Sequence, residues 1–190
     1  MATTQPIRSK AQVRALAQYF LRRGQPRNYT LVVLGIYTGL RISDLLRLKW
    51  DDVYDFENRQ VRSTLYVIEK KTHKSKIIAL NKQVVSALTL RLRHARAGAF
   101  LIENPRTKKA ISRIQAYRII RDAARALMLQ VRVSCHSLRK TFGYHAWKSG
   151  VSPAVIMEIF NHSSYTVTKR YLGIAQDDKN AVYLGMELFA

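Results

Sequence analysis

The chain has 190 residues and a formal net charge of +21, from 33 lysines and arginines against 12 aspartates and glutamates. This length suits one domain with a hydrophobic core, and the charge indicates a polyanionic partner, most often nucleic acid. No apolar run approaches the ~18 residues of a membrane span, and the N-terminus has no hydrophobic signal region. A single cysteine, Cys135, excludes an internal disulfide. These features predict a cytoplasmic protein without a membrane partner.

The charge is unevenly distributed along the chain. Residues 1–148 hold 30 basic and 8 acidic residues, a net charge of 30 − 8 = +22, and residues 149–190 hold 3 and 4, a net charge of 3 − 4 = −1. The first part is therefore expected to meet phosphate, and the last part to have another task. Charge alone also fits a solvated basic surface of the ribosomal type, so it supports binding and not catalysis.

The N-terminal part is predicted to be helical. Ser9 can cap a first helix whose apolar residues follow helical spacing. Asn28 can cap a second helix, YTLVVLGIYTG, which is mostly apolar all round and hence expected to be buried. Gly39 is expected to end it, after which RISDLLRL restarts a short helix.

Residues 53–80 are rich in β-branched and aromatic residues, which predicts three short antiparallel strands: DVYDF, QVRSTLYVIE and SKIIAL. Helical spacing resumes after Asn81 and again after Ser112, and a later helix, SLRKTFGYHAWKSG, is expected to end at Gly150. A serine–proline pair at 152–153 opens another helix. The predicted fold is mainly α with a small three-stranded antiparallel β-sheet, an α+β class.

The acidic residues form one cluster, Asp51, Asp52, Asp55 and Glu57, where a strand and a turn are predicted. A solvated turn is a better interpretation of this cluster than a Mg²⁺ site of a nuclease. No His/Cys set has zinc spacing, and no glycine-rich phosphate loop is present. Any chemistry on a phosphodiester is therefore expected to use no metal and no other cofactor.

Three stretches offer groups for metal-free phosphoryl transfer. TGLRISDLLRL places Arg41 and Asp44 three residues apart at a helix start, so that the carboxylate can orient the guanidinium. CHSLRK places His136 and Arg139 on one helical face, and IFNHSS places His162 at a helix end. Each pattern alone also fits a surface pair or a cap. Their order and spacing together are far more specific.

TGLRISDLLRL, HSLRKTF and NHSSYTVTKRY together resemble the three signature boxes of the tyrosine recombinase (phage integrase) family. The resemblance begins near residue 8 and covers nearly the whole chain. It implies the tyrosine recombinase catalytic fold. The family's nucleophilic tyrosine follows the last histidine by nine residues, an interval that this chain keeps without a gap. The implied catalytic set is a hairpin lysine together with Arg41, His136, Arg139, His162 and Tyr171.

The hairpin lysine is one of four in EKKTHKSK. Lys71 is favoured, because family members often have Lys-Thr followed by a basic turn. The other basic residues near the signature boxes are expected to contact DNA phosphates. These are Lys70, Lys74, Lys76, Arg113 and Lys140.

The chain departs from the family pattern at two places. Asp44 stands where a glutamate is usual and can still buttress the arginine. Phe160-Asn161 stands where Leu-Gly is usual, and asparagine tolerates a positive φ. Cys135 precedes His136, but adjacent residues on a helix do not face each other, so the cysteine is expected to be a small packing residue.

The resemblance implies a site-specific recombinase that acts on double-stranded DNA by way of a 3′-phosphotyrosyl intermediate, in integration, excision or inversion. Tyr171 would attack, His136 would be the general base and Lys71 the general acid. The phosphorane would be held by Arg41, Arg139 and His162. Two alternatives stay open: a catalytically silent DNA-binding accessory module, and a type IB topoisomerase-like enzyme.

Most members of the family carry an N-terminal domain that clamps the other side of the DNA. The early start of the boxes implies a short recombinase, like those of fimbrial phase variation, or an excised fragment; Met1 favours the first. Residues 1–175 are expected to form the catalytic domain. Residues 176–190 are expected to form an amphipathic helix that docks on a neighbour in a homotetramer on DNA, with packing inside the same chain as the alternative. A bacterial, nucleoid-associated location is implied.

The last box contains two tyrosines, Tyr165 and Tyr171, about 240° apart round a helix. Tyr165 is predicted to pack and Tyr171 to react. Nine helical residues span ~13.5 Å, too far for His162 and Tyr171 to meet on one straight helix. Either Ser163 or Ser164 breaks and recaps the chain, or Tyr171 reaches its phosphate on a mobile segment, in its own active site or a neighbour's.

Overall fold

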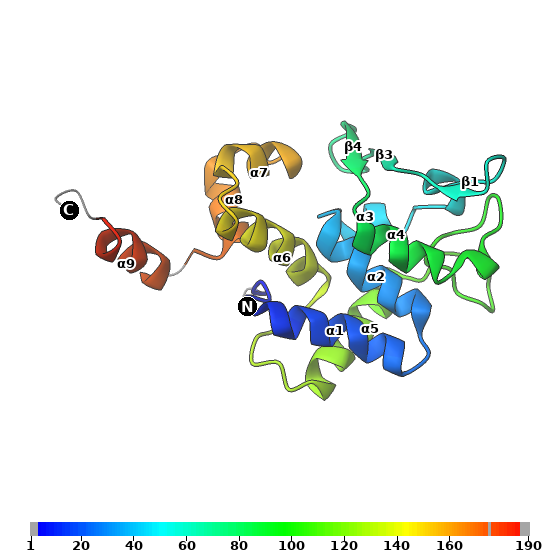
Figure 1. Cartoon of the computed structure of the whole chain (residues 1–190), viewed down its shortest axis with the longest axis horizontal. Helices are drawn as coiled ribbons and strands as arrows, with labels where there is room; N and C mark the ends of the chain where they lie inside the picture. Colours follow the sequence, from blue (N-terminus) through cyan, green and yellow to red (C-terminus); the bar gives the residue numbers. More distant parts are fainter. Residues whose placement is uncertain (1–3, 175, 187–190) are drawn as a thin grey trace.

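The computed structural model describes residues 4–174 and 176–186, which are mainly helical (Figure 1). The helices of this part are α1 (Lys10–Arg22), α2 (Pro26–Tyr37), α3 (Ile42–Leu45), α4 (Lys82–Thr89), α5 (Arg113–Ala126), α6 (Cys135–Lys148), α7 (Pro153–Ile159), α8 (Tyr165–Leu172) and α9 (Gln176–Leu184). The strands are β1 (Tyr54–Asp55), β2 (Gln60–Val61), β3 (Thr64–Ile68) and β4 (Ser75–Ala79), and 3₁₀ turns occur at η1 (Trp50–Asp52) and η2 (Leu92–His94).

Side-chain caps begin several helices where the sequence predicted them. The side chain of Ser9 accepts a backbone hydrogen bond at the start of α1, Asn81 does so for α4, Ser112 for α5 and Ser152 for α7. Each cap satisfies a backbone N–H that has no partner within the first helical turn. The starts of these four helices were therefore readable from local sequence.

The predicted cap at Asn28 is wrong. Helix α2 begins at Pro26, whose fixed φ suits the first helical turn and whose missing N–H costs nothing there. Asn28 is buried inside the helix, where its Oδ1 accepts from Arg27 and its Nδ2 donates to Gln25 at 3.0 Å. The proline was the stronger start signal.

Residues 53–80 form two antiparallel hairpins, β1 with β2 and β3 with β4, and not the predicted single three-stranded sheet. The chain changes partner within the segment predicted as one strand. The Arg62 N–H donates to the Val53 carbonyl at 2.9 Å and closes the first hairpin, whereas the Ser63 carbonyl accepts from the Leu80 N–H at 2.8 Å and belongs to the second. A strand pattern indicates extended backbone but does not identify the pairing partner.

The main hydrophobic core surrounds α2, which is buried along most of its length. Gly35 permits α2 to approach α6 closely, since a Cβ atom there would lie 2.6 Å from a methyl carbon of Leu138. A smaller apolar cluster of Ile156, Phe160 and Leu172 joins α6, α7 and α8. Figure 1 shows α6, α7 and α8 on one side of the molecule and α3, α4 and the strands on the other.

The residues before α1 contact α6 and the end of α8. The Ile7 N–H donates to the Thr141 hydroxyl at 2.9 Å, and the Ile7 carbonyl lies 3.0 Å from Nε2 of His145, both on α6. The Arg8 guanidinium donates to the Gly173 carbonyl at 2.6 Å, directly after α8. This segment therefore anchors the end of the helix that carries Tyr171.

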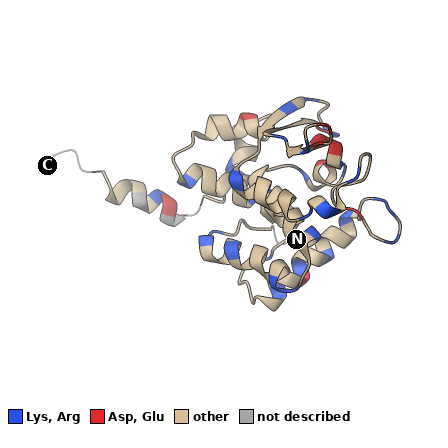
Figure 2. Ribbon diagram, turned by 45° about the vertical axis from the view of Figure 1, so that its right-hand side comes forward, with Lys and Arg blue, Asp and Glu red and all other residues tan. Residues whose placement is uncertain are grey.

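Lysines and arginines are spread over the helical body, and acidic residues occupy a few segments (Figure 2). Helix α9 extends away from that body (Figure 1), and an ion pair of 2.6 Å joins its Asp178 to Lys148 of α6. Within the described residues, no helix has the length and apolar character that crossing a membrane requires.

Candidate active site

Arg139 of α6 lies at the centre of the candidate site. Its side chain is 1% exposed, and its guanidinium donates to the carbonyls of Gly39 and, at 2.7 Å, Phe160. Its guanidinium carbon lies 4.2 Å from the centroid of the Phe160 ring. Gly39 has a φ of +60°, which glycine adopts without strain, and the resulting turn directs its carbonyl towards this arginine.

The end of α7 gathers cations from three other segments. The Phe160 carbonyl accepts from Arg139 and from Arg41 at 3.4 Å, and the Ile159 carbonyl accepts from Lys76 of β4. The last carbonyls of a helix have no intrahelical partner and carry partial negative charge. We refer to Arg41, Lys76 and Arg139 as the cation cluster.

Glu69, a residue that the sequence interpretation missed, connects the parts of the site. It is fully buried, and its carboxylate lies 2.6 Å from Nη1 of Arg41 and 3.2 Å from Nζ of Lys76. It also accepts hydrogen bonds from Thr72 at 2.8 Å and Asn161 at 3.0 Å. Burial alone would raise its pKa, but these hydrogen bonds and the two cations lower the pKa to about 2. Glu69 is therefore ionised and fixes the two cations.

A signal for Glu69 was present in the sequence. Leu65 and Val67 of β3 are buried, and Tyr66 and Ile68 between them are exposed. Continuing this alternation by two residues places Glu69 on the buried face. A buried carboxylate requires a cation or several donors, so its position alone indicated a partner.

The expected contact between Asp44 and Arg41 is not made. Asp44 is buried, and its Oδ1 accepts from the backbone N–H of Lys70 at 3.0 Å, while its Oδ2 has no hydrogen-bond partner among the described residues. Glu69 takes the place beside the Arg41 guanidinium instead. Asp44 thus fixes the backbone at the start of the turn between β3 and β4.

The four hairpin lysines are divided between two environments. Lys76 reaches the cation cluster, and its pKa is lowered by burial and by the nearby arginines, against the opposing effect of Glu69. Lys70, Lys71 and Lys74 are exposed around the turn. The structure therefore brings Lys76, predicted only as a DNA contact, into the site, and leaves the predicted general acid Lys71 on the hairpin surface.

His162 and Tyr171 meet because the chain bends between α7 and α8. Asn161 has a φ of +49°, as its position predicted, and Ser164 is extended at the cap position of α8. The rings of His162 and Tyr171 consequently lie 4.6 Å apart, and Nδ1 of His162 lies 3.0 Å from the Thr168 hydroxyl. Of the two predicted routes, the break before α8 is the one observed, although Ser164 makes no side-chain capping bond.

Tyr171 packs beside Arg139 of the cation cluster in its own chain. Its ring centroid is 5.5 Å from that of Phe160 and 5.8 Å from the guanidinium carbon of Arg139. The prediction that Tyr165 packs is wrong: it is 50% exposed at the start of α8. The first turn of this helix projects beyond the small core that Leu172 enters at its other end.

The two histidines of the predicted set are in a strongly cationic environment. Burial, followed by the charges of Arg139 and Arg41, lowers the pKa of His162 to about 4. Burial also lowers the pKa of His136, with added effects from Lys140 and both arginines. Both imidazoles are therefore neutral at pH 7 and able to accept a proton.

Arg139 keeps a donor free for an anion. Burial, followed by the charge of Arg41, lowers its pKa to about 10, so it is still protonated at pH 7. Its Nε is buried and has no hydrogen-bond partner among the described residues. A buried donor without a partner is costly, and a phosphate oxygen would supply the missing acceptor.

The remaining predicted residues lie outside this cluster or serve the fold. Arg113 is exposed at the start of α5. Lys140 is buried, and its ammonium donates to the Thr4 carbonyl at 2.6 Å, because this face of α6 packs against the N-terminal segment. Its contact with DNA stays a prediction, and in this structure its ammonium is occupied by the N-terminal segment. Burial raises the pKa of the Cys135 thiol to about 11, which agrees with packing.

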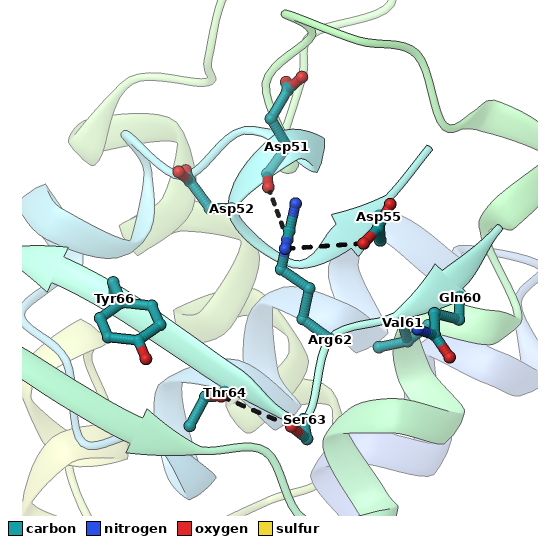
Figure 3. Close-up of a pocket in the computed structure, with 9 residues that line it drawn as sticks. All are labelled: Asp51, Asp52, Asp55, Gln60, Val61, Arg62, Ser63, Thr64 and Tyr66. Atoms are coloured by element: carbon teal, nitrogen blue, oxygen red, sulfur yellow. Dashed lines mark hydrogen bonds and ion pairs between the residues drawn. The ribbon is translucent and has the colours of Figure 1, made fainter. Parts of the chain in front are cut away.

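The acidic cluster is used to hold loops (Figure 3). One carboxylate oxygen of Asp51 and one of Asp52 each accept a backbone N–H at 2.7 Å. Arg62 lies between Asp51, whose carbonyl it contacts at 3.2 Å, and the carboxylate of Asp55 at 3.9 Å (Figure 3). Across the described parts of the chain, no group of three or more His, Cys, Asp and Glu side chains is placed to hold a metal ion.

Comparison with known proteins gives sequence relatives over nearly the whole chain. YoeC of Bacillus subtilis (strain 168), named a probable integrase/recombinase, is 39% identical over 183 residues, which cover 96% of this chain and 97% of YoeC. The tyrosine recombinase XerD of Mycobacterium tuberculosis (strain ATCC 25618 / H37Rv) is 29% identical over 167 residues. Those residues cover 84% of this chain and 51% of XerD, so the chain spans about half the length of that relative.

Solved structures share the fold. The XerA recombinase superimposes with a TM-score of 0.76 at 25% identity, over 96% of this chain and 66% of XerA. XerH bound to its palindromic difH substrate gives a TM-score of 0.75 at 17% identity, over 97% of this chain and 55% of XerH, which shows likeness of fold alone. The family model described as "Phage integrase family" matches residues 8–177. The chain therefore belongs to the phage integrase family, the tyrosine recombinase family that its three signature boxes resemble.

Proposed function

We propose that this chain is a site-specific recombinase that cleaves and rejoins double-stranded DNA through a 3′-phosphotyrosyl intermediate, in integration, excision or inversion. The observation that carries the proposal is the position of Tyr171 beside His162 and Arg139. A phenol is mostly protonated at neutral pH, so it needs a proton acceptor and nearby cations to attack a phosphodiester. The family membership and the recombinase names of its relatives support the same reaction.

In the proposed step, the Tyr171 hydroxyl oxygen attacks the scissile phosphorus and the bond from phosphorus to the 5′ oxygen breaks. His136 takes the phenolic proton, and Lys71 gives a proton to the departing 5′ oxygen. A 5′-hydroxyl from a partner strand later reverses these transfers and religates the DNA. No cofactor enters the step. The phosphorane is held by Arg41, Arg139 and His162.

Several features support these assignments. The lowered pKa of His136 keeps its imidazole neutral, in the base form, at pH 7. The Nε of Arg139 has no hydrogen-bond partner among the described residues and can donate to a phosphate oxygen. Lys71 is exposed on the β3–β4 hairpin, and its side chain is therefore free of packing that would keep it from DNA. Because Tyr171 packs against His162 and Arg139 of its own chain, we infer that it cleaves the DNA bound by the same protomer.

The proposed assembly is a homotetramer on two copies of a specific DNA site. Residues 1–175 would be the catalytic unit and residues 176–190 the docking segment; residues 1–3, 175 and 187–190 lie outside those the structure describes. In support, α9 extends from the body, and apolar side chains at its end are exposed: Val182, Tyr183, Leu184 and Met186. Action on chromosomal DNA would place the protein at the bacterial nucleoid, in the cytoplasm.

A suicide DNA substrate, nicked so that the released strand diffuses away, tests the nucleophile. Tyr171→Phe should bind this DNA and form no covalent adduct, while Tyr165→Phe, altered at an exposed tyrosine of the same helix, should form it at the wild-type level. Denaturing electrophoresis of labelled DNA measures the adduct. An adduct formed by Tyr171→Phe would refute the assignment.

The family's recombinase names favour recombination over the two alternatives. A type IB topoisomerase-like enzyme would relax supercoiled plasmid that lacks any specific site. A silent accessory module would bind DNA and form no adduct on any substrate. Plasmid relaxation and the suicide substrate, measured on the same preparation, therefore separate all three activities.

A further inference from the structure

A second group of cations surrounds a cavity of about 600 Å³ at the N-terminal end of α2. We refer to it as the α2 cavity. Gly39 and Arg41 of the candidate active site follow the opposite end of this helix, whose 12 residues span ~18 Å. The two sites are therefore distinct. The charged residues that line the α2 cavity are Arg27, Arg91, Arg93, Arg96, Lys108 and Glu103.

Arg91 is the most buried of these cations. Its side chain is 5% exposed, and its guanidinium carbon lies 5.4 Å from the ring centroid of Trp50, another lining residue. Nη1 donates to the Leu101 carbonyl at 2.6 Å, the one hydrogen bond that its guanidinium makes within the described residues. Burial, followed by the charge of Arg27, lowers its pKa to about 10, against the opposing effect of the nearby Glu103 carboxylate. Arg91 is thus a buried cation beside another cation.

Arg27 is also without a carboxylate partner in the described part of the chain. Its guanidinium donates to the Glu103 carbonyl at 3.2 Å and to the amide oxygen of Asn28 at 2.9 and 3.1 Å. It lies in the first turn of α2, which contains no acidic residue and whose N-cap residue, Gln25, makes no side-chain capping bond. The positive end of the helix therefore adds to the charge at this cavity.

The single acidic side chain of the α2 cavity is already engaged. The Glu103 carboxylate accepts from Arg96 at 2.9 and 3.0 Å and lies 3.8 Å from Lys108. Five lysines and arginines against this one carboxylate leave 5 − 1 = +4 at the cavity. Arg91 is buried and Arg27 half-buried, and neither forms an ion pair with a carboxylate among the described residues. Burying a cation without such a partner is costly, so an anion from outside would complete the site.

We propose that the α2 cavity binds a phosphate group, held by the guanidinium groups of Arg27 and Arg91 together with two cations at its rim, Arg93 and Lys108. The planar fork of arginine matches phosphate oxygens bidentately, and the N-terminus of α2 favours the same charge. Arg93 and Lys108, both exposed at the rim, would attract it. The phosphate belongs to a free oligophosphate or to the backbone of DNA that extends beyond the candidate active site.

Trp50 provides a local signal for the test, because the chain has two tryptophans. In Trp147→Phe protein, fluorescence reports Trp50 alone. Titration with pyrophosphate at constant ionic strength should change this fluorescence saturably. Arg93→Gln/Lys108→Gln in the same background should weaken the apparent affinity by about tenfold or more. Arg14→Gln/Lys82→Gln, which removes two exposed cations away from the cavity, should leave it unchanged.

A second titration with a 30-base-pair duplex identifies the source of the phosphate. A response to pyrophosphate that depends on Arg93 and Lys108 supports a free-anion site. If only the duplex gives a response, and that response depends on Arg93 and Lys108, the site is a DNA-backbone contact. No response to either probe, or equal responses in the two double variants, would overturn the proposal. Thermal unfolding of each variant verifies that it is folded.

Discussion

Two buried charged residues set the electrostatics of the candidate active site. Glu69 is ionised and pairs with Arg41 and Lys76. Arg139 has no carboxylate partner among the described residues, and it retains an unpartnered Nε. The buried carboxylate therefore fixes part of the cation cluster, and the central arginine is left to meet an anion. Pre-positioned donors of this kind stabilise charge that develops in a transition state.

At the residue scale, the two hairpin lysines are predicted to differ in a chemical rescue experiment. Lys71→Met should slow cleavage by roughly 10²–10⁴-fold, the usual contribution of a general acid. A DNA substrate with sulfur at the bridging 5′ position should restore the cleavage rate of Lys71→Met, because a thiolate leaves without needing a proton. Lys76→Met should be slow on both substrates, since Lys76 holds Glu69 and the end of α7.

Single-turnover adduct formation with both substrates measures this rescue. Lys74→Met, altered at another exposed lysine of the same turn, is the matched control and should respond little to the sulfur. Rescue of Lys76→Met instead of Lys71→Met would transfer the general-acid role to Lys76.

The free energy of unfolding is predicted to decrease as the pH is lowered, because of His162. Its folded-state pKa of about 4 lies below its ordinary value of 6.5. The unfolded chain therefore binds the proton more tightly, so the contribution of His162 is complete above about pH 6.5 and is lost as the pH falls towards 4. His162→Asn should flatten the decline.

Urea unfolding at intervals between pH 7 and pH 5 measures that decline in the free energy of unfolding. His73→Asn, at an exposed turn position of positive φ where asparagine fits, should keep the wild-type slope. A slope that is equally steep in His162→Asn would contradict the assigned environment of His162.

At the scale of elements, the end of α7 organises the site. Its last carbonyls collect the cation cluster, and the left-handed Asn161 turns the chain so that α8 brings Tyr171 back to His162. The same asparagine donates to Glu69 at 3.0 Å. Asn161 therefore sets both the direction of the chain between α7 and α8 and the position of Glu69, which holds Arg41 and Lys76.

Substitutions at Asn161 are predicted to separate these two contributions. Asn161→Gly keeps the backbone conformation and removes the hydrogen bond to Glu69, a loss of ~1 kcal/mol. Asn161→Ala removes the same bond and adds the left-handed strain of a Cβ residue, a further ~1–2 kcal/mol. Urea unfolding and adduct formation should both rank wild type above glycine and glycine above alanine. Equal values for alanine and glycine would show that backbone strain is unimportant here.

At the scale of the whole molecule, a strongly basic body carries a nearly neutral, projecting C-terminal helix. The body contains the candidate active site and the α2 cavity, both of which have unbalanced positive charge. The end of α9 offers exposed apolar side chains instead. The charge division along the chain coincides only in part with this spatial division, because the nearly neutral residues 149–190 also include α7 and α8, which pack on the body and carry His162 and Tyr171.

The apolar end of α9 is predicted to be needed for assembly on DNA. Two variants test this: Tyr183→Ser/Leu184→Ser and a protein that lacks residues 176–190. Both should bind one DNA site normally but fail to form the complex on paired sites, because the apolar area that assembly would bury is lost. Sedimentation of protein with DNA measures the complex. Ile114→Ser/Met128→Ser, altered at exposed apolar residues of the body, should assemble normally. Normal assembly by both α9 variants, with lowered thermal stability, would support packing inside the chain.

The sequence by itself determined the fold class, most helix starts and the order of the signature boxes. These depend on local physics, because caps, helical spacing and residues three or nine positions apart involve only about one to three turns of chain. For the same reason, the left-handed Asn161 and the break before α8 were predictable. The strand segments were also indicated, but their pairing into two hairpins was not.

Tertiary structure decided the contacts between distant segments. Glu69 bonds to Asn161 across 92 residues, and Asp44 contacts the Lys70 backbone in place of Arg41. Lys76 lies in the site and Lys140 is buried beneath the N-terminal segment. A sequence specifies which groups are available, whereas the choice among competing partners depends on packing. Arg27 and Arg91 of the α2 cavity form no ion pair among the described residues, and only the folded structure shows this, because it places the nearby Glu103 carboxylate against Arg96.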